Sequence, residues 1–289
     1  MDRRTYLSVT ATAALASIAG CQGSESDTED DDTEAGTPED TPAGETVLAW
    51  REWIPAGLVI GTDAQVMVLD TNRAKAELPA ETYTEFQLGQ IANALDISES
   101  NIDRMAGVQR GENTSDIVLT GSYNPAQVVD ALNVEQSNVE RYEGYQVVQD
   151  QFAIGSSAIV VSTNYETLID TKAGAQPYLG QNDEEWNRLL TSIQDATLGV
   201  GTAGTLDDDP TIDASKSGVT INAADGSGAR ISIYVHYESE SAAKEAMDTA
   251  REEFVSGATG NDDVDIERFD REGSRIIIEG TTPNFSFTQ

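Results

Sequence analysis

His236 is the only histidine of the 289-residue chain, so it is the first residue to consider for catalysis. It lies in the alternating run Ile231–Tyr237, where the aliphatic residues share one face of a strand and His236 lies on the other. With no second histidine and only one cysteine, a zinc site built from histidine and cysteine is excluded. A Ser–His–Asp site lacks the Gly-x-Ser-x-Gly turn that would expose a nucleophile. The alternation therefore favours a solvated strand residue over a catalytic one.

Carboxylate pairs could hydrolyse glycosides, a reaction that needs two acids flanking a sugar. The chain contains 51 Asp and Glu residues, so such a pair can be chosen almost anywhere and identifies no site. The acidic stretches Asp207–Pro210 and Asn261–Asp265 favour solvated loops over calcium sites. Asp225-Gly226-Ser227-Gly228 is typical of a hairpin turn, and no Gly-x-x-x-x-Gly-Lys-Ser/Thr loop is present. We therefore predict no catalytic residue, no metal and no cofactor.

The first 21 residues combine two export signals. Arg3 and Arg4 precede Val9–Ala19, an apolar run of about eleven residues, which suits a signal peptide and is too short to span a bilayer. The string from Asp2 to Leu7 is similar to the twin-arginine export motif. Ile18-Ala19-Gly20-Cys21 has the order of a lipobox, in which small residues precede the cysteine that receives a lipid. Together these patterns predict a signal peptide over residues 1–20.

Cys21 is the only cysteine, so no intrachain disulfide can form and its thiol must have another use. Its position beside an acidic run argues against burial. A diacyl lipid on this cysteine would anchor the protein stably, because each buried CH₂ contributes about 0.8 kcal/mol and two chains are added. We therefore predict a protein held by Cys21 on the extracellular face of the cell membrane.

Residues 22–45 contain ten acids, no base and no large apolar side chain. Such a segment cannot bury apolar surface, and its like charges extend it. We predict that residues 21–45 are a lipidated cysteine followed by a disordered acidic spacer, and that residues 46–289 form the folded part.

The folded part is itself strongly acidic. Residues 46–289 contain 40 acids and 15 bases, a net charge of -25 out of -34 for the whole chain, and only four of the chain's cations are lysine. This excess causes self-repulsion that molar salt would screen, because the Debye length then falls to about 3 Å. A surface without a basic face also argues against nucleic acid as a partner. Acidic, lysine-poor proteins of this kind are similar to those of salt-loving archaea.

Apolar periodicity from Thr46 onward predicts short strands alternating with helices. Helix starts are indicated by a capping-box spacing at Thr82, by Asn124 before Pro125, and by Asn164 and Asn182. The predicted strands include Leu58–Ile60, Val66–Val68, Ile102–Gln109, Ile117–Ser122, Val139–Tyr142, Tyr145–Val148, Ala158–Ser162, Ile231–Tyr237, Asp265–Phe269 and Arg275–Ile278. The pattern predicts an α+β fold of antiparallel sheets covered by helices.

The order strand, helix, hairpin occurs twice, over residues 101–174 and 199–282. Both hairpins open with similar residues, Val139–Tyr142 in the first and Ile266–Phe269 in the second. This order predicts two related units, at about 46–180 and 181–289, in which these two segments occupy equivalent positions. The alternative is one continuous domain.

Trp50 and Trp53 follow the spacer directly. Exposed, they could stack on a sugar or a partner, but Ile54 beside them favours burial against the core. Asn113 and Asn284 each begin a triplet that fits the glycosylation acceptor pattern, and Asn113 is the better candidate because it lies in a predicted turn.

With its twin arginines, lipobox and acidic spacer, the chain resembles the uncharacterised twin-arginine-exported lipoproteins of haloarchaea. That resemblance implies a location and a salt habit, and no activity. We expect a non-enzymatic interaction or accessory module of the cell envelope. Its expected partners are the membrane, through the lipid on Cys21, and an envelope protein or glycan.

Two other functions are alternatives to this one. The first is an extracellular carboxylate-dependent hydrolase. The second, a solute-binding receptor, is disfavoured because its two doubly wound lobes are hard to find. An inward-facing acid with a raised pKa in a cleft would favour the hydrolase, whereas an exposed apolar patch would favour the interaction module.

Overall fold

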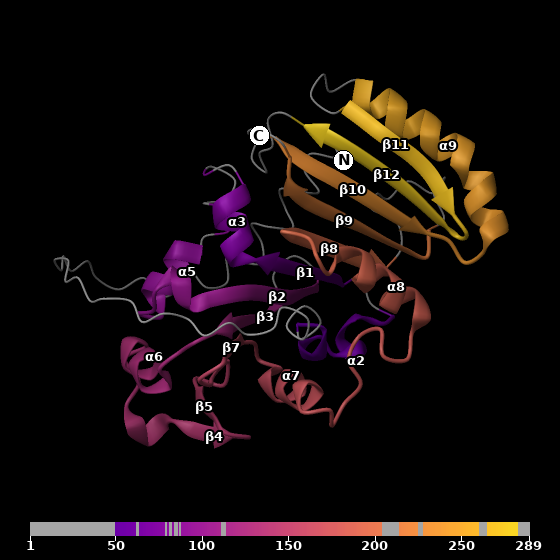
Figure 1. The fold of residues 1–289 in the computed structure, drawn as a ribbon. Helices are drawn as coiled ribbons and strands as arrows, with labels where there is room; N and C mark the ends of the chain where they lie inside the picture. The colour runs from indigo at the N-terminus through magenta and orange to yellow at the C-terminus, as the bar shows by residue number, and fades with distance from the viewer. Residues whose placement is uncertain are drawn as a thin grey trace, which may run out of the picture.

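The computed structural model describes residues 50–61, 64–78, 80, 83, 86, 88–110, 114–203, 214–224, 228–259 and 265–282. These residues form a mixed α+β fold on one antiparallel sheet of twelve strands, in the order β11-β12-β10-β9-β8-β1-β2-β3-β7-β6-β5-β4 (Figure 1). The strands are β1 (Gln65–Asp70), β2 (Ile102–Arg110), β3 (Thr114–Gly121), β4 (Glu140–Tyr142), β5 (Tyr145–Val148), β6 (Phe152–Ile154), β7 (Ala158–Val161), β8 (Leu198–Ala203), β9 (Lys216–Ala223), β10 (Ala229–His236), β11 (Asp265–Glu272) and β12 (Arg275–Thr282). The helices are η1 (Arg51–Trp53), α2 (Ala56–Val59), α3 (Thr71–Glu77), α5 (Leu88–Ala94), η2 (Glu99–Asn101), α6 (Pro125–Ala131), η3 (Gln136–Asn138), α7 (Tyr165–Lys172), α8 (Glu184–Ile193) and α9 (Glu240–Thr259).

The sheet has two covered faces, which the strand register defines. Met67 of β1 lies opposite Val200 of β8, Val200 opposite Val219 of β9, and Val219 opposite Ile233 of β10, so these residues share face 1. Their neighbours along the strands share face 2, because successive side chains of a strand point to opposite sides. The central pair β1–β8 joins the strands β1–β7 and the strands β8–β12 into one sheet.

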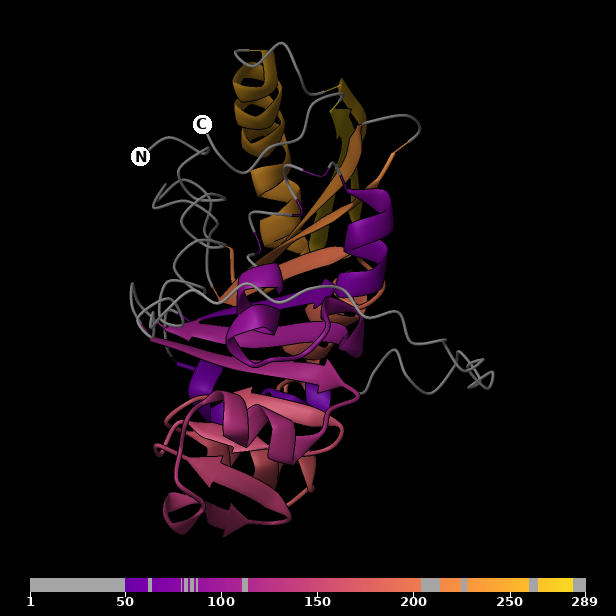
Figure 2. The same ribbon diagram turned by 90° about the vertical axis from the view of Figure 1, so that its left-hand side faces the viewer.

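Helices cover both faces with separate apolar clusters. Helices α3, α5 and α6 pack on face 1, and α9 packs on the same face over β10 and β12, along β11 (Figures 1 and 2). Helices α7 and α8 and the segment that begins at Trp50 pack on face 2. Trp50 and Trp53 are 1% and 3% exposed, which confirms their predicted burial. Both faces of the sheet therefore belong to the core.

Glycines let α8 approach the sheet closely. A Cβ atom on Gly218 would lie 2.6 Å from Cδ1 of Leu189, and one on Gly199 would lie 2.8 Å from the carbonyl oxygen of Ile193. Neither position has room for a side chain, so the backbone of β8 and β9 is the surface on which α8 rests. This contact fixes the distance between α8 and the neighbouring strand β10.

Several local predictions are confirmed. The side-chain oxygen of Asn124 accepts a hydrogen bond from the main-chain N–H of Ala126 at 3.2 Å, and Pro125 is the first residue of α6. Strands β4 and β5 form the predicted hairpin, with Glu143 and Gly144 both at positive φ. Two consecutive left-handed residues suit the tight turn of a two-residue hairpin.

Two local predictions are wrong. Leu58 and Val59 belong to the short helix α2, because this segment crosses face 2, where Val59 is buried and Leu58 packs against an apolar cluster, instead of pairing as a strand. Helix α8 is capped by Asp183 and not by Asn182, since Asp183 Oδ1 accepts from the main-chain N–H of Trp186 at 2.9 Å. The capping box predicted at Thr82 lies outside the described residues.

The predicted equivalence of Val139–Tyr142 and Ile266–Phe269 is also wrong. Strand β4 is separated from β3 by β7, β6 and β5, whereas β11 is separated from β10 by β12 alone. The difference arises because the chain after β5 makes two further strands, and β7 is the one that returns to β3. The predicted separate sheets are one larger sheet.

Asp116 forms a buried polar cluster on face 2, where β3 meets the start of α7. Its side chain is 1% exposed, and its Oδ2 accepts from Arg110 at 2.8 and 3.2 Å. Its Oδ1 accepts from the hydroxyl of Ser162 and from the side-chain amide of Asn164 at 3.1 Å. The amide of Asn164 is thus used by Asp116, and the main-chain N–H of Asn164 donates to Ser162 Oγ at 2.7 Å. The cluster ties β2, β3, β7 and α7 together.

Among the described residues, no helix is long and apolar enough to cross a membrane. Cys21, Arg3 and Arg4, on which the predicted anchor and export signal depend, lie outside those residues, as do the whole signal peptide and the spacer.

Candidate functional site

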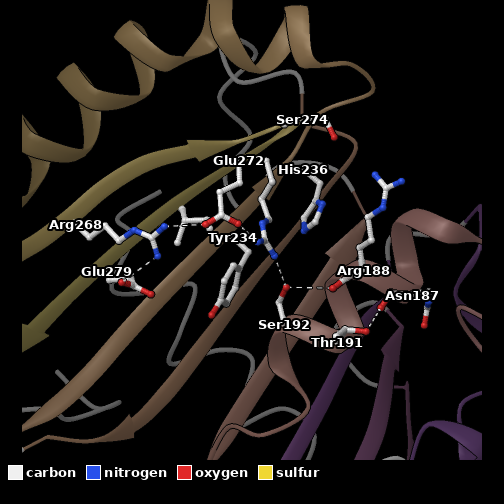
Figure 3. A pocket seen from close by; sticks show the side chains of 13 residues that line it. Asn187, Arg188, Thr191, Ser192, Tyr234, His236, Arg268, Glu272, Ser274 and Glu279 are labelled. Carbon is white, nitrogen blue, oxygen red and sulfur yellow. Dashed lines mark hydrogen bonds and ion pairs between the residues drawn. The ribbon is translucent and has the colours of Figure 1, made fainter.

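A groove of about 640 Å³ opens on face 2 between α8 and the strands β10, β11 and β12. Its volume is in the range of about 300–1,000 Å³ that small-molecule sites occupy. Figure 3 shows side chains of α8 facing those of the three strands across the groove. The residues that define it are Arg188 and Ser192 of α8, Tyr234 and His236 of β10, Arg268 and Glu272 of β11, and Arg275 and Glu279 of β12.

His236 is buried in the wall of this groove, with 3% of its surface exposed. The prediction of a solvated strand residue is therefore wrong. The alternation was read correctly, because His236 does lie opposite the aliphatic face of β10, but α8 covers the side that was expected to face water. The sequence of β10 alone carries no sign of that cover.

The imidazole of His236 is held neutral. Burial, and then the positive charge of Arg275, lower its pKa to about 4; Arg188 and Lys216 act in the same direction and Glu185 against them. Its Nε2 atom is buried and has no hydrogen-bond partner among the described residues. At neutral pH this side chain therefore offers one N–H donor and one lone pair, and carries no charge.

Arg275 is fixed from several sides. It donates to Ser192 Oγ at 2.9 Å and to Glu272 at 2.6 Å, and its guanidinium carbon lies 5.6 Å from the centre of the Tyr234 ring. Arg188, one turn before Ser192 on α8, forms an ion pair with Glu184. Both arginines line the groove, Arg275 from β12 and Arg188 from α8.

The acids of the groove are engaged by arginine. Glu272 accepts from Arg275 and from Arg268, and these hydrogen bonds hold its pKa below the usual value. Glu279 lies 3.6 Å from Arg268. A glycosidase acid needs a raised pKa so that it is protonated at neutral pH. Among the described carboxyl groups only that of Asp103 has a raised pKa, and Asp103 is an exposed residue of β2 outside the groove.

Ser192 is not arranged as a nucleophile. Its hydroxyl donates to the carbonyl oxygen of Arg188 at 3.1 Å and accepts from Arg275 at 2.9 Å. A serine nucleophile needs its proton directed at a base, with its oxygen lone pairs free to attack. Here the proton is engaged by a main-chain carbonyl, and a guanidinium withdraws electron density from the oxygen. The geometry favours binding over covalent catalysis.

A second hollow, of about 710 Å³, opens beside Tyr123 and is lined by uncharged polar residues and Ile97. The side chains of two of them serve the fold: that of Asn101 donates to the carbonyl oxygen of Ser122, and that of Gln127 donates to Asp96. Within the part of the chain that the structure describes, no group of three or more His, Cys, Asp or Glu could hold a metal ion. The arginine-lined groove is therefore the better candidate.

Asn113 and Asn284, the glycosylation candidates, lie outside the described residues, as do the acid-rich stretch at 207–210 and most of the one at 261–265. The sequence analysis missed Arg188, Arg275 and Ser192. One signal was available, since three of the chain's few bases occur within the eight residues from Arg268 to Arg275. No protein-family model, curated protein or solved structure matches this chain.

Proposed function

We propose that this protein is a lipoprotein tethered to the extracellular face of the cell membrane, where it acts as a non-enzymatic binding module of the envelope. We further propose that the groove between α8 and β10–β12 is its binding site. The observation that carries the proposal is the state of the polar groups in that groove. Arginine and hydroxyl donors line it, while its acids and Ser192 are engaged in ways that do not suit catalysis.

The anchor has a direct test in Cys21→Ser. We expect this variant to appear in the medium, or to remain as the uncleaved precursor, because serine has no thiol to receive a lipid. The measurement is the division of the protein between medium, salt-washed membranes and detergent extract, with Ser24→Ala as a control that leaves the lipobox intact. Continued membrane attachment that only detergent releases would show that no lipid on Cys21 is needed.

Binding in the groove can be tested with two matched variants, one at Arg188 and one at Arg230. Arg188 and Arg230 are both about half exposed, with side chains 51% and 57% accessible, and each is ion-paired with one glutamate. Arg188 lines the groove, whereas Arg230 lies toward the opposite end of β10 and does not. Reversing either charge therefore costs the fold a similar, small amount.

We expect Arg188→Glu to reduce binding to isolated cell envelopes at least about tenfold, a loss of about 1.4 kcal/mol, and Arg230→Glu to leave it unchanged. Both are made in the Cys21→Ser chain, so that no lipid contributes to retention, and binding is measured in molar potassium chloride. Equal binding of the two variants would exclude the groove as the envelope-binding site.

A further inference from the structure

The groove contains a buried polar atom that makes no hydrogen bond within the described fold. His236 is 3% exposed, yet its Nε2 atom meets no partner among the described residues. A buried polar atom without a hydrogen bond is costly, by about 1–3 kcal/mol, so native proteins rarely keep one without a use. Figure 3 shows His236 directed from β10 toward the side of the groove where Ser192 and Arg188 lie.

The two arginines beside this atom also have unused donors. A guanidinium has five N–H groups. For Arg275 two hydrogen bonds are found, to Ser192 and Glu272, and for Arg188 one, to Glu184. The remaining N–H groups meet no acceptor among the described residues. Arg275 lies directly opposite His236 in the pairing of β10 with β12, and the positive charges of both arginines lower the pKa of the imidazole.

From this arrangement we propose that an anionic group, a carboxylate, sulfate or phosphate, binds in the groove between Nε2 of His236 and the guanidinium groups of Arg275 and Arg188. The proposal rests on the proposed function and gives the chemical class of its ligand. The Nε2–H tautomer of the neutral imidazole would donate to this group, and the guanidinium groups add charged donors. Charge-assisted hydrogen bonds of this kind are about twice as strong as neutral ones.

A cation is a poorer fit to the same groove. The two acids that line it, Glu272 and Glu279, are both paired with Arg268. The strong negative charge of the whole chain would repel an anion at low salt. In molar salt the Debye length is about 3 Å, so that repulsion is screened and the contacts inside the groove decide.

The single histidine gives the test a direct signal. The full chain is labelled with ¹³C-histidine, which yields a single set of imidazole resonances, and is titrated in molar potassium chloride with sulfate, phosphate, glucuronate or glucose. We expect a saturable shift with the anions, at a Kd of about 1 mM, and none with glucose. The bound anion should also raise the pKa of His236 from about 4 by about one unit or more, because it offsets the nearby positive charges.

Arg188→Gln and Arg230→Gln separate a site from general ion effects. We expect Arg188→Gln, in an exposed helix position, to weaken the anion titration about tenfold and Arg230→Gln to leave it unchanged, with both circular dichroism spectra like that of the wild type. Saturation by glucuronate at a lower concentration than by the inorganic ions would assign the site to an acidic sugar; saturation by the inorganic ions alone would assign it to a free oxyanion.

The proposal is overturned if no anion gives a saturable shift, or if Arg188→Gln responds like the wild type, which would indicate an adventitious ion only. A saturable shift with glucose alone would contradict the proposal that the ligand is an anion, but it would still be consistent with a binding site in the groove. The outcome for the ligand class is thereby separate from the outcome of the envelope-binding experiment.

Discussion

Replacing Asp116 by alanine is expected to lower the free energy of unfolding by about 3 kcal/mol, the low end of the cost of removing one partner from a buried ion pair, because Arg110 is 28% exposed. The carboxylate is 1% exposed and accepts hydrogen bonds from Arg110, Ser162 and Asn164. Alanine would leave the guanidinium of Arg110 without its partner and two further donors without their acceptor. A typical domain has only about 5–15 kcal/mol of net stability.

The measurement is urea unfolding in molar potassium chloride, because guanidinium chloride would itself change the ionic strength. The matched control is Asp270→Ala, which removes an aspartate of β11 whose side chain is 57% exposed and which pairs with Arg268. An exposed pair contributes about 0–1 kcal/mol, so this control should stay near the wild type. Equal losses for the two variants would mean that Asp116 is not the centre of a buried cluster.

The burial of Asp116 could not be predicted from the sequence. It is one of 51 acids, and nothing in its local sequence separates it from the solvated ones. It is buried because β3 is an interior strand and α7 begins over it, and both facts depend on pairing between distant segments. A composition in which most acids are exposed makes the buried one harder to identify.

Local patterns were read more successfully, because their causes lie within a few residues. The apolar positions Trp186, Leu189, Leu190 and Ile193 follow the spacing of one helix face, and all four are buried. The Asn124 cap needs only the neighbouring N–H groups, and the turn at Glu143 and Gly144 needs only two left-handed residues. Strand order and the cover over His236 are set by non-local packing, so neither could be read from one segment.

The groove follows from that non-local packing. Glycines in β8 and β9 bring α8 close to the sheet, and α8 then stands beside β10 with Arg188 and Ser192 on the side that faces the strands. A side chain on Gly218 would push Leu189 away and move this wall. The positions that shape the candidate site therefore include residues that do not line it.

The melting temperature of the protein is expected to fall by about 10 °C or more when potassium chloride is lowered from molar concentration to about 0.1 M. Residues 46–289 carry a net charge of -25, and over this change the Debye length grows from about 3 to about 10 Å. For a domain of this size 1 kcal/mol shifts the melting temperature by about 2–4 °C, so repulsion of only about 3–5 kcal/mol is sufficient. Thermal melts followed by circular dichroism measure the effect.

Charge variants distinguish repulsion from a general effect of salt on apolar surface. Asp130, Glu140, Glu143, Asp150 and Glu245 are exposed and form no ion pair among the described residues. Changing all five to the matching amides keeps their size and removes five negative charges, so the variant should lose less stability at low salt than the wild type. The same number of changes in residues 22–45 should have little effect, because that segment is predicted to lie outside the folded part. If the folded-part variant and the spacer variant shift equally, or if neither shifts, salt acts on this protein through apolar burial and not by screening its charge.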